Sequence, residues 1–159
     1  MANSNSIIYL KGDATKPVTN GNKIIAHICN DIGKWGKGFV LAVSKRWPAP
    51  EKEFKAWFKS QQNFELGQAQ FVQVEPDTWI ANIIGQHKII KDEQGNPPIR
   101  YEAVSAGLQK VAAFAAEINA TVHMPRIGCG LAGGTWDKIE PIITKEMSNR
   151  AVEVYVYDF

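Results

Sequence analysis

The chain has 159 residues, of which 45% are hydrophobic and 21% charged, as expected for one globular domain with one core. The formal net charge of +2 is too small to indicate a protein built for general binding to nucleic acid or to a membrane surface. No segment approaches the run of about 20 apolar residues that a membrane-spanning helix needs. The segment Met1–Ser6 is polar and short, so we expect no signal peptide and no membrane contact.

The cysteines and histidines are few and far apart. Cys29 and Cys129 are isolated thiols, which favours a reducing, cytoplasmic location. His27, His87 and His123 lack the close spacing of zinc ligands, so we predict neither a metal site nor a cofactor. We expect a monomer.

Strands and helices alternate in the first half of the chain. Residues 24–29 are nearly all apolar, which is typical of a strand covered on both faces. Phe39, Val40, Val43 and Trp47 recur at helical spacing, and Pro48 ends that helix. The pattern predicts strands at 7–11 and 24–29, followed by helices at 39–47 and 51–60.

The second half continues this alternation. Strands at 70–75 and 79–84 flank a Pro76-Asp77 turn, and a long helix with one apolar stripe follows from Pro98. A strand at 121–126, a helix at 136–147 and a closing strand at 152–157 complete the prediction. This order predicts an α/β fold of three layers, with helices on both faces of a central mixed sheet.

The first segment that suggests chemistry runs from His27 to Phe39, where a buried strand gives way to a helix. Its glycines at 33, 36 and 38 let the backbone approach a ligand closely. The helix that follows begins with unpaired N–H groups and the positive end of its dipole, which suits a phosphate or pyrophosphate. The alternative is a glycine-rich turn that only reverses the chain.

The second segment, Pro125 to Trp136, also leads from a strand to a helix and contains four glycines within seven residues. Ligands of open α/β sheets bind at the carboxyl ends of the strands, so the two glycine-rich loops can line one cleft. A third segment, Gly12-Asp13-Ala14, follows the first strand. Its aspartate either accepts a hydrogen bond from an exocyclic amine such as that of adenine, or caps a turn.

These three segments, in this order, resemble the macro domain family over essentially the whole chain, as a single domain of residues 1–159. The resemblance implies that Lys11 to Ala14 recognise adenine, and that Asn30 to Phe39 embrace the pyrophosphate and distal ribose of ADP-ribose. It further implies that Gly128 to Gly134 bind phosphate, and that the last strand, ending at Phe159, lies near the adenine.

Within this family, Pro125 to Leu131 resemble the branch that contains terminal ADP-ribose protein glycohydrolase. The pattern from His27 to Gly38 resembles the ADP-ribose 1''-phosphate phosphatases of the same branch. We therefore expect an ADP-ribose-binding hydrolase that acts on a derivative such as ADP-ribose 1''-phosphate. The alternatives are a non-catalytic reader of ADP-ribose, or a glycohydrolase that removes ADP-ribose from a protein or nucleic acid.

Some catalytic positions of the family differ in this chain. The glycohydrolase uses a lysine at the end of the second hairpin strand, where this chain has Gln86 or His87 with Lys88 close by. It also uses an aspartate in the second loop, where this chain has Ala132. Other hydrolytic macro domains carry an aspartate after the first glycines, at the place of Val40. We therefore expect neither of these mechanisms.

The remaining catalytic candidates are His27, Asn30 and Asp31. Histidine suits proton transfer near neutral pH, although a histidine in an apolar strand is also a common core residue. Asn30 either binds the distal ribose or caps the following turn, and Asp31 is either a base or a solvent-facing carboxylate.

Other side chains of the loops also have two interpretations. Trp35 either covers the ligand as a lid or packs across the loop, and Arg126 either pairs with a phosphate or faces solvent. Cys129 is interpreted as a small filler in a phosphate loop rather than a nucleophile. The residues that we expect to contact the ligand are Gly12, Asp13, Ala14, Gly33, Trp35, Gly36, Lys37, Gly38, Phe39, Arg126, Gly128, Cys129, Gly130, Leu131, Ala132, Gly133 and Gly134.

Overall fold

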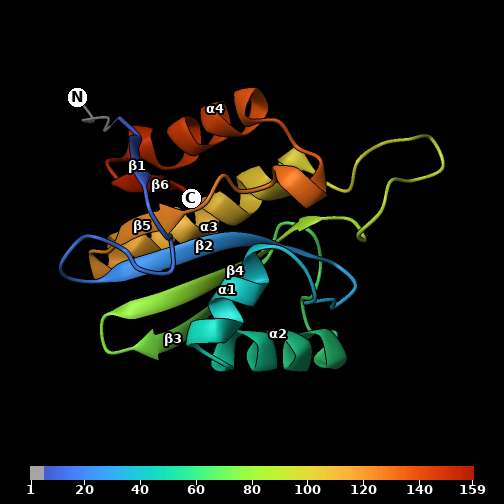
Figure 1. Cartoon of the computed structure of the whole chain (residues 1–159), viewed down its shortest axis with the longest axis horizontal. Helices are drawn as coiled ribbons and strands as arrows, with labels where there is room; N and C mark the ends of the chain where they lie inside the picture. Colours follow the sequence, from blue (N-terminus) through green and yellow to red (C-terminus); the bar gives the residue numbers. More distant parts are fainter. Residues whose placement is uncertain (1–5) are drawn as a thin grey trace.

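A six-stranded sheet lies between two layers of helices in the computed structural model, which describes residues 6–159 (Figure 1). Most of the polar segment Met1–Ser6, and with it the expectation of no signal peptide, lies outside the described residues. No helix within residues 6–159 has the length and apolar character needed to cross a membrane.

The helices and strands follow the predicted order. The strands are β1 (Ile8–Lys11), β2 (Lys23–Asn30), β3 (Ala69–Glu75), β4 (Thr78–Gln86), β5 (Thr121–Met124) and β6 (Val154–Asp158). The helices are α1 (Phe39–Arg46), α2 (Ala49–Ser60), α3 (Tyr101–Ile118) and α4 (Trp136–Glu146), with short 3₁₀ turns at Gly130–Ala132 and Ser148–Arg150.

The sheet is mixed, as predicted, with strand order β1-β6-β5-β2-β4-β3. All neighbouring strands run parallel except β3 and β4, which form the antiparallel hairpin at one edge. Because β2, β4 and β5 are parallel neighbours, their carboxyl ends meet at the same edge of the sheet. This topology brings the segments that follow these three strands together.

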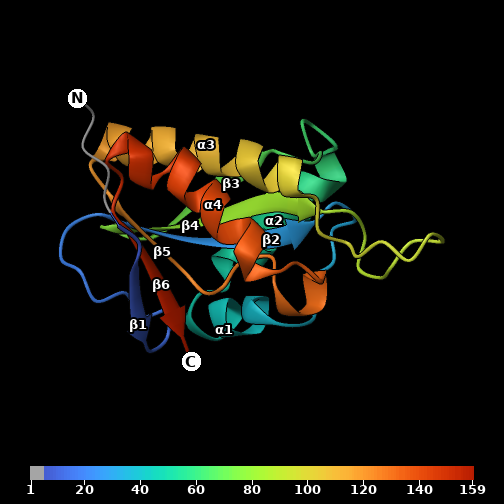
Figure 2. The same ribbon diagram turned by 90° about the horizontal axis from the view of Figure 1, so that it is seen from above.

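The two helical layers cover opposite faces of the sheet, as the two views in Figures 1 and 2 show. Alternation along β2 explains this arrangement, since successive side chains of a strand point to opposite faces. Ile24 and Ala26 belong to the core beneath α3 and α4, whereas Ile25 and Cys29 belong to the core beneath α1 and α2. Burial on both faces requires the continuous apolar run that the sequence shows.

Several element boundaries differ from the prediction, and three of these differences have a clear physical reason. α3 begins at Tyr101 instead of Pro98, because Ile99 forms an antiparallel bridge with Gln86. β5 ends at Met124, directly before Pro125, which has no N–H to donate to the sheet. β6 begins at Val154, because the Val152 N–H donates to the Met147 carbonyl and closes the end of α4.

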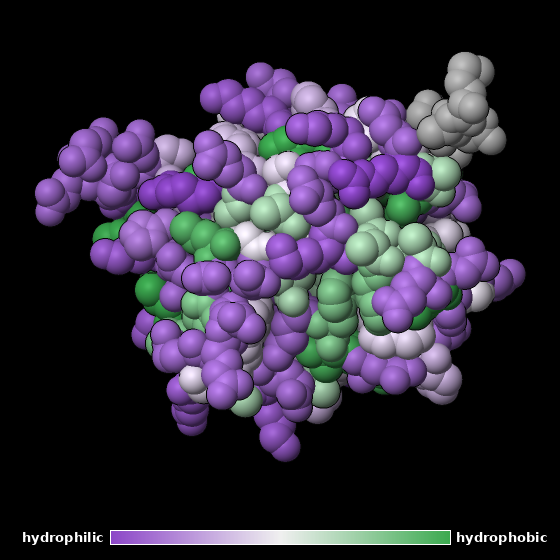
Figure 3. Space-filling view, turned by 180° about the vertical axis from the view of Figure 1, so that it is seen from behind, coloured by the Kyte–Doolittle hydropathy of each residue, from purple (hydrophilic) through white to green (hydrophobic). Residues whose placement is uncertain are grey.

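The face shown in Figure 3 carries many polar side chains, with hydrophobic side chains exposed between them. The loop between β4 and α3 protrudes from the body of the molecule (Figure 1). Ile89 and Ile90 on this loop are exposed, as is Leu131 beside the carboxyl end of the sheet.

Candidate functional site

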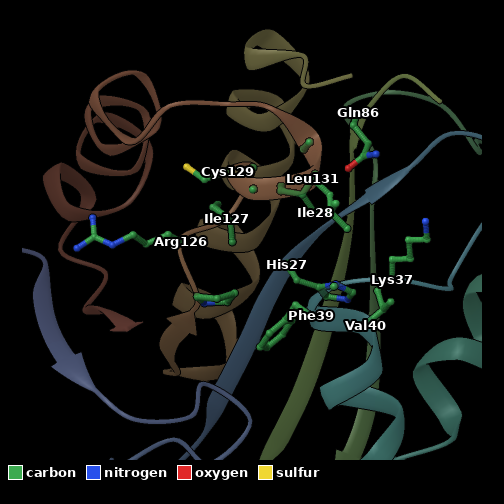
Figure 4. Close-up of a pocket in the computed structure, with 15 residues that line it drawn as sticks. His27, Ile28, Lys37, Phe39, Val40, Gln86, Arg126, Ile127, Cys129 and Leu131 are labelled. Carbon is green, nitrogen blue, oxygen red and sulfur yellow. The ribbon is translucent and has the colours of Figure 1, made fainter. Parts of the chain in front are cut away.

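A cleft of about 330 Å³ lies at the carboxyl ends of β2, β4 and β5. Loop 1 (residues 31–38) connects β2 to α1, and loop 2 (residues 125–135) connects β5 to α4. Both loops line the cleft, and Figure 4 shows them facing each other across it. The lining residues are His27, Ile28, Lys37, Gly38, Phe39, Val40, Gln86, Pro125, Arg126, Ile127, Gly128, Cys129, Gly130, Leu131 and Ala132.

Gly38 lies beside loop 2 at the end of loop 1. Its backbone has φ 82° and ψ −146°, a conformation that side chains with a Cβ rarely adopt. A Cβ placed on Gly38 would lie 3.6 Å from Cδ1 of Leu131, so loop 1 and loop 2 are in near contact at this point. The glycine therefore provides the turn into α1 and leaves the floor of the cleft free of a side chain.

The cleft contains backbone N–H groups that suit an anion. The first N–H groups of a helix have no partner within the helix, so those of Phe39 and Val40 are available at the start of α1. Gly130 and Leu131 begin the 3₁₀ turn of loop 2 on the opposite side. The helix dipole adds partial positive charge at the same place. The arrangement can hold a phosphate or pyrophosphate between the loops.

Two cationic side chains mark opposite ends of the cleft (Figure 4). Lys37 is exposed and lies near Gln86 at one end. At the other end, Arg126 donates two hydrogen bonds to Asp158, from Nε at 2.7 Å and from a terminal nitrogen at 2.9 Å. Its guanidinium also lies over the rings of Tyr9 and Trp136, at 5.2 and 5.0 Å from their centroids. Arg126 is therefore fixed by the protein, while Lys37 is free to follow a ligand.

The segment Gly12-Asp13-Ala14 does not line the 330 Å³ cleft. It adjoins the Arg126 end, because the Gly12 N–H donates to the Asp158 carbonyl at 2.8 Å. The Asp13 carboxylate accepts hydrogen bonds from the N–H and hydroxyl of Thr15 at 2.8 and 2.7 Å. Burial raises the pKa of Asp13, but these bonds outweigh it and hold the pKa below its ordinary value. Asp13 thus caps a turn, and adenine recognition here stays a prediction.

His27 forms part of the inner wall of the cleft, with its side chain buried on the α1 side of the sheet. Its Nε2 lies 2.6 Å from Oδ1 of Asn82, whose amide nitrogen donates to Gln70 Oε1 and the Pro50 carbonyl. These donations fix Oδ1 as an acceptor, so Nε2 of His27 carries the proton. Burial lowers the pKa of His27 to about 4. The contacts favour a structural role, and a catalytic role stays a prediction.

Asn30 organises loop 1 from within. Its Oδ1 accepts hydrogen bonds from the N–H groups of Ile32 and Lys34 at 3.1 and 3.0 Å. Its Nδ2 donates to the Lys34 carbonyl at 2.8 Å. Asn30 is buried and does not line the cleft, so the structure supports the capping interpretation.

Asp31 faces the segment that follows β4. Its Oδ2 lies 2.7 Å from Nδ1 of His87, and its Oδ1 accepts the Lys88 N–H at 2.8 Å. Only 17% of the Asp31 side chain is exposed, so the solvent-facing interpretation is wrong. The sequence analysis did not pair Asp31 with His87, because the two residues lie 56 positions apart.

Trp35 packs in the core beneath α1 and α2, so the lid interpretation of its side chain is wrong. Its Nε1 donates to Ser44 Oγ at 2.7 Å, and its ring meets those of His27 and Phe54 at centroid distances of 5.4 and 5.5 Å.

Burial raises the pKa of the Cys129 thiol more than the charge of Arg126 lowers it. Cys129 is therefore a neutral thiol in the cleft wall, as expected for a filler.

The other predicted glycines lie around the cleft instead of lining it. A Cβ on Gly33 would clash with Phe58, and one on Gly133 would lie 2.5 Å from Pro97, so both pack against other parts of the chain. Gly36 has open space around it, and Gly134 closes the turn of loop 2. These positions shape the loops that carry the lining residues.

Five lining residues are absent from the site residues that the sequence predicts: Ile28, Val40, Gln86, Pro125 and Ile127. Gln86 could have been found, because it ends a strand parallel to β2, and its register partner is Asn30. The rule that ligands gather at the carboxyl ends of parallel strands applies to this strand as much as to β2 and β5. Within residues 6–159, no group of three or more His, Cys, Asp or Glu side chains is arranged to hold a metal.

The fold is a three-layer α/β domain with a glycine-lined cleft between two loops at the carboxyl ends of its parallel strands. No protein-family model matches the sequence. A solved macrodomain protein from Streptomyces coelicolor is 52% identical, covers 97% of this chain and 99% of its own, and superposes with a TM-score of 0.86. A Bacteroides thetaiotaomicron protein of unknown function is 56% identical over 97% of this chain and 98% of its own, with a TM-score of 0.96. The chain belongs to the macrodomain family.

Curated relatives are more distant. The ADP-ribose 1''-phosphate phosphatase of Candida albicans is 26% identical over 94% of this chain and 99% of its own length. The mouse chromodomain-helicase-DNA-binding protein 1-like is 28% identical over 98% of this chain. The chain spans only 18% of that mouse protein and 15% of its zebrafish counterpart.

Proposed function

We propose that the chain binds ADP-ribose in the cleft and hydrolyses an ADP-ribose derivative such as ADP-ribose 1''-phosphate. The observation that carries this proposal is the convergence of loop 1 and loop 2 on one cleft of about 330 Å³. Backbone N–H groups from the start of α1 and from the 3₁₀ turn then surround one place where a pyrophosphate fits. The similarity to the Candida albicans phosphatase, which covers nearly the full length of both chains, supports the choice of ligand.

The two ends of the cleft give the ligand a direction. The Arg126 end adjoins Gly12 and Asp13, which the family resemblance assigns to adenine. The distal ribose and its substituent then lie toward Lys37 and Gln86, which is the end where loop 1 meets β4.

The binding part of the proposal is tested by titration calorimetry with ADP-ribose on the wild type, Lys37→Ala and Lys34→Ala. Lys37 lines the cleft, and its charge should attract the diphosphate from the neighbouring distal-ribose end, so its removal should weaken binding by about tenfold, or about 1.4 kcal/mol. Lys34 is an exposed lysine of the same loop that does not line the cleft, and its removal should leave the affinity unchanged. Equal affinity in all three proteins would contradict this placement of the pyrophosphate.

The hydrolytic part is tested by incubating the protein with ADP-ribose 1''-phosphate and measuring the release of inorganic phosphate. A second candidate function, a non-catalytic reader, is favoured by the hydrogen bonds that occupy the side chains of His27 and Asn30. Tight binding of ADP-ribose without any hydrolysis would select the reader.

A third function remains within the proposal, in which the derivative is ADP-ribose attached to a protein or nucleic acid. Mass spectrometry of a modified substrate before and after treatment distinguishes this glycohydrolase from the phosphatase.

The two free thiols, buried Cys29 and half-buried Cys129, suit the cytoplasmic location that forms part of this proposal. Gel filtration with light scattering tests the expected monomer.

A further inference from the structure

A histidine–carboxylate pair joins the ends of β2 and β4. Asp31 directly follows β2, and His87 directly follows β4. The Asp31 Oδ2 and His87 Nδ1 atoms lie 2.7 Å apart, which is a short hydrogen bond for a nitrogen and an oxygen. The pair connects the start of loop 1 to the start of the protruding loop between β4 and α3.

The geometry fixes the tautomer of the imidazole ring. A carboxylate can only accept hydrogen bonds, so Nδ1 of His87 must carry the proton that lies between the two groups. The neutral ring therefore keeps a lone pair on Nε2. The His87 side chain is 42% exposed, which leaves this nitrogen accessible to water and to a bound molecule.

The backbone holds both partners of this pair in place. The Asp31 N–H donates to the Gln86 carbonyl at 3.1 Å, and the His87 N–H donates to the Pro98 carbonyl at 2.8 Å. The second oxygen of the Asp31 carboxylate accepts the Lys88 N–H at 2.8 Å. Both carboxylate oxygens thus accept a hydrogen bond, and these bonds hold Asp31 in the position that orients the His87 ring.

The pair adjoins the Gln86 end of the cleft, although neither the Asp31 nor the His87 side chain is among the residues that line it. Gln86 lines the cleft, and it is both the residue before His87 and the backbone partner of Asp31 (Figure 4). This is the end to which the proposed function assigns the distal ribose and its leaving group. An oriented imidazole with a free Nε2 is a suitable general base at such a place.

We propose that His87, oriented by Asp31, is the catalytic base for hydrolysis at the distal end of the bound ADP-ribose derivative. This inference rests on the proposed function. Nε2 takes a proton from a water molecule while the water oxygen bonds to the phosphorus of the 1''-phosphate. The bond from phosphorus to the ribose oxygen breaks on the opposite side, that oxygen takes a proton from solvent water, and the ring returns its own proton to solvent. One water is consumed, one inorganic phosphate is released, and the neutral ring is restored.

The test compares His87→Ala, Asp31→Asn and Lys91→Ala with the wild type, in phosphate-release kinetics and in ADP-ribose calorimetry. General-base catalysis accounts for about 10²–10⁴-fold in rate, so His87→Ala should lower kcat by at least about 100-fold. Asp31→Asn should lower kcat to a smaller extent, because the amide still accepts hydrogen bonds but no longer stabilises the charged ring. Lys91→Ala removes an exposed side chain from the same protruding loop and should change nothing.

Two further readouts separate catalysis from a structural effect. In the wild type, the pH profile of kcat/KM should have an acid limb, and this limb should be absent in His87→Ala. Within residues 6–159, the charged group that is hydrogen-bonded to the His87 ring is Asp31. Lys88 and Asp92 follow His87 along the chain. Added imidazole should restore part of the activity of His87→Ala, which requires a folded site that still binds ADP-ribose.

The outcomes distinguish this inference from the function on which it rests. Loss of kcat in His87→Ala with unchanged ADP-ribose affinity, and rescue by imidazole, supports it. Full activity with an unchanged pH profile in His87→Ala would overturn the role of His87 and leave the proposed hydrolase standing. A wild type that binds ADP-ribose but releases no phosphate would overturn the base and the phosphatase together, and a wild type that does not bind would overturn the whole function.

Discussion

Two histidines of this chain are buried with neutral partners. His27 pairs with the amide of Asn82, and His123 lies between Tyr157 on one ring nitrogen and the hydroxyls of Thr19 and Thr121 on the other. Burial lowers the pKa of His27 to about 4 and that of His123 to about 3. Within residues 6–159, no carboxylate is hydrogen-bonded to either ring to offset the cost of a charge, so both side chains stay neutral in the folded protein.

This neutrality predicts that folding stability falls in acid. Between the unfolded pKa of about 6.5 and the folded values, the unfolded chain binds more protons than the folded chain. The contribution of the neutral histidines to the free energy of unfolding is present in full above pH 6.5. It is lost as the pH falls toward 4, by up to about 3 kcal/mol for His27. Urea unfolding at a series of pH values measures the slope. His27→Gln should have a shallower slope than the wild type, and an equal slope would contradict the neutral assignment.

Loop 2 is a tight turn whose shape depends on small residues. The Gly134 N–H donates to the Gly128 carbonyl at 2.8 Å, and the Gly133 N–H donates to the Gly130 carbonyl at 3.0 Å. These bonds hold the 3₁₀ turn of Gly130–Ala132. The element proposed to bind the ligand is therefore formed by short-range backbone contacts and lies between β5 and α4.

A methyl group on Gly134 should disrupt this turn. A Cβ there would lie 2.3 Å from the Gly128 carbonyl oxygen, a backbone atom that cannot move without opening the loop. We expect Gly134→Ala to destabilise the protein by about 1–3 kcal/mol, the usual cost of overpacking. The matched control is Gly36→Ala in loop 1, where a Cβ would meet no atom within 4 Å. Thermal unfolding of both variants compares them, and equal stability would contradict the steric argument.

At the scale of the whole molecule, the sheet topology creates the cleft. The parallel order β5-β2-β4 places loop 1, loop 2 and Gln86 at one edge, although they come from three distant parts of the chain. The Arg126–Asp158 pair then connects the end of β6 to loop 2, and the Asp31–His87 pair connects loop 1 to the end of β4. Ligand binding between these loops therefore engages four of the six strands.

Such a ligand should stabilise the folded state by mass action. At a free concentration of 100 times Kd, ADP-ribose should add about 2.7 kcal/mol to the free energy of unfolding. For a chain of this size that corresponds to a rise in Tm of about 5–10 °C. A thermal-shift titration measures it, with AMP as the control because it lacks the pyrophosphate. An equal shift with AMP would contradict the proposed role of the loops in holding a diphosphate.

The sequence by itself determined the order of strands and helices, the three-layer fold and the two glycine-rich loops. These features follow from local patterns: the apolar run of 24–29, the helical spacing of Phe39 to Trp47, and glycines directly after strands. Hydrophobic periodicity and backbone freedom act over a few residues, so they can be recognised without knowing what packs against them.

Only the tertiary structure decided which side chains form hydrogen bonds and which partners they have. His27 was identified from its position, but the Asn82 partner that keeps it neutral comes from a neighbouring strand. Asp31 meets His87 because the register of β2 and β4 shifts at Cys29/Asn30 and aligns Asn30 with Gln86. Contacts between residues tens of positions apart depend on strand register and on which face a side chain occupies, and a one-residue shift reverses that face.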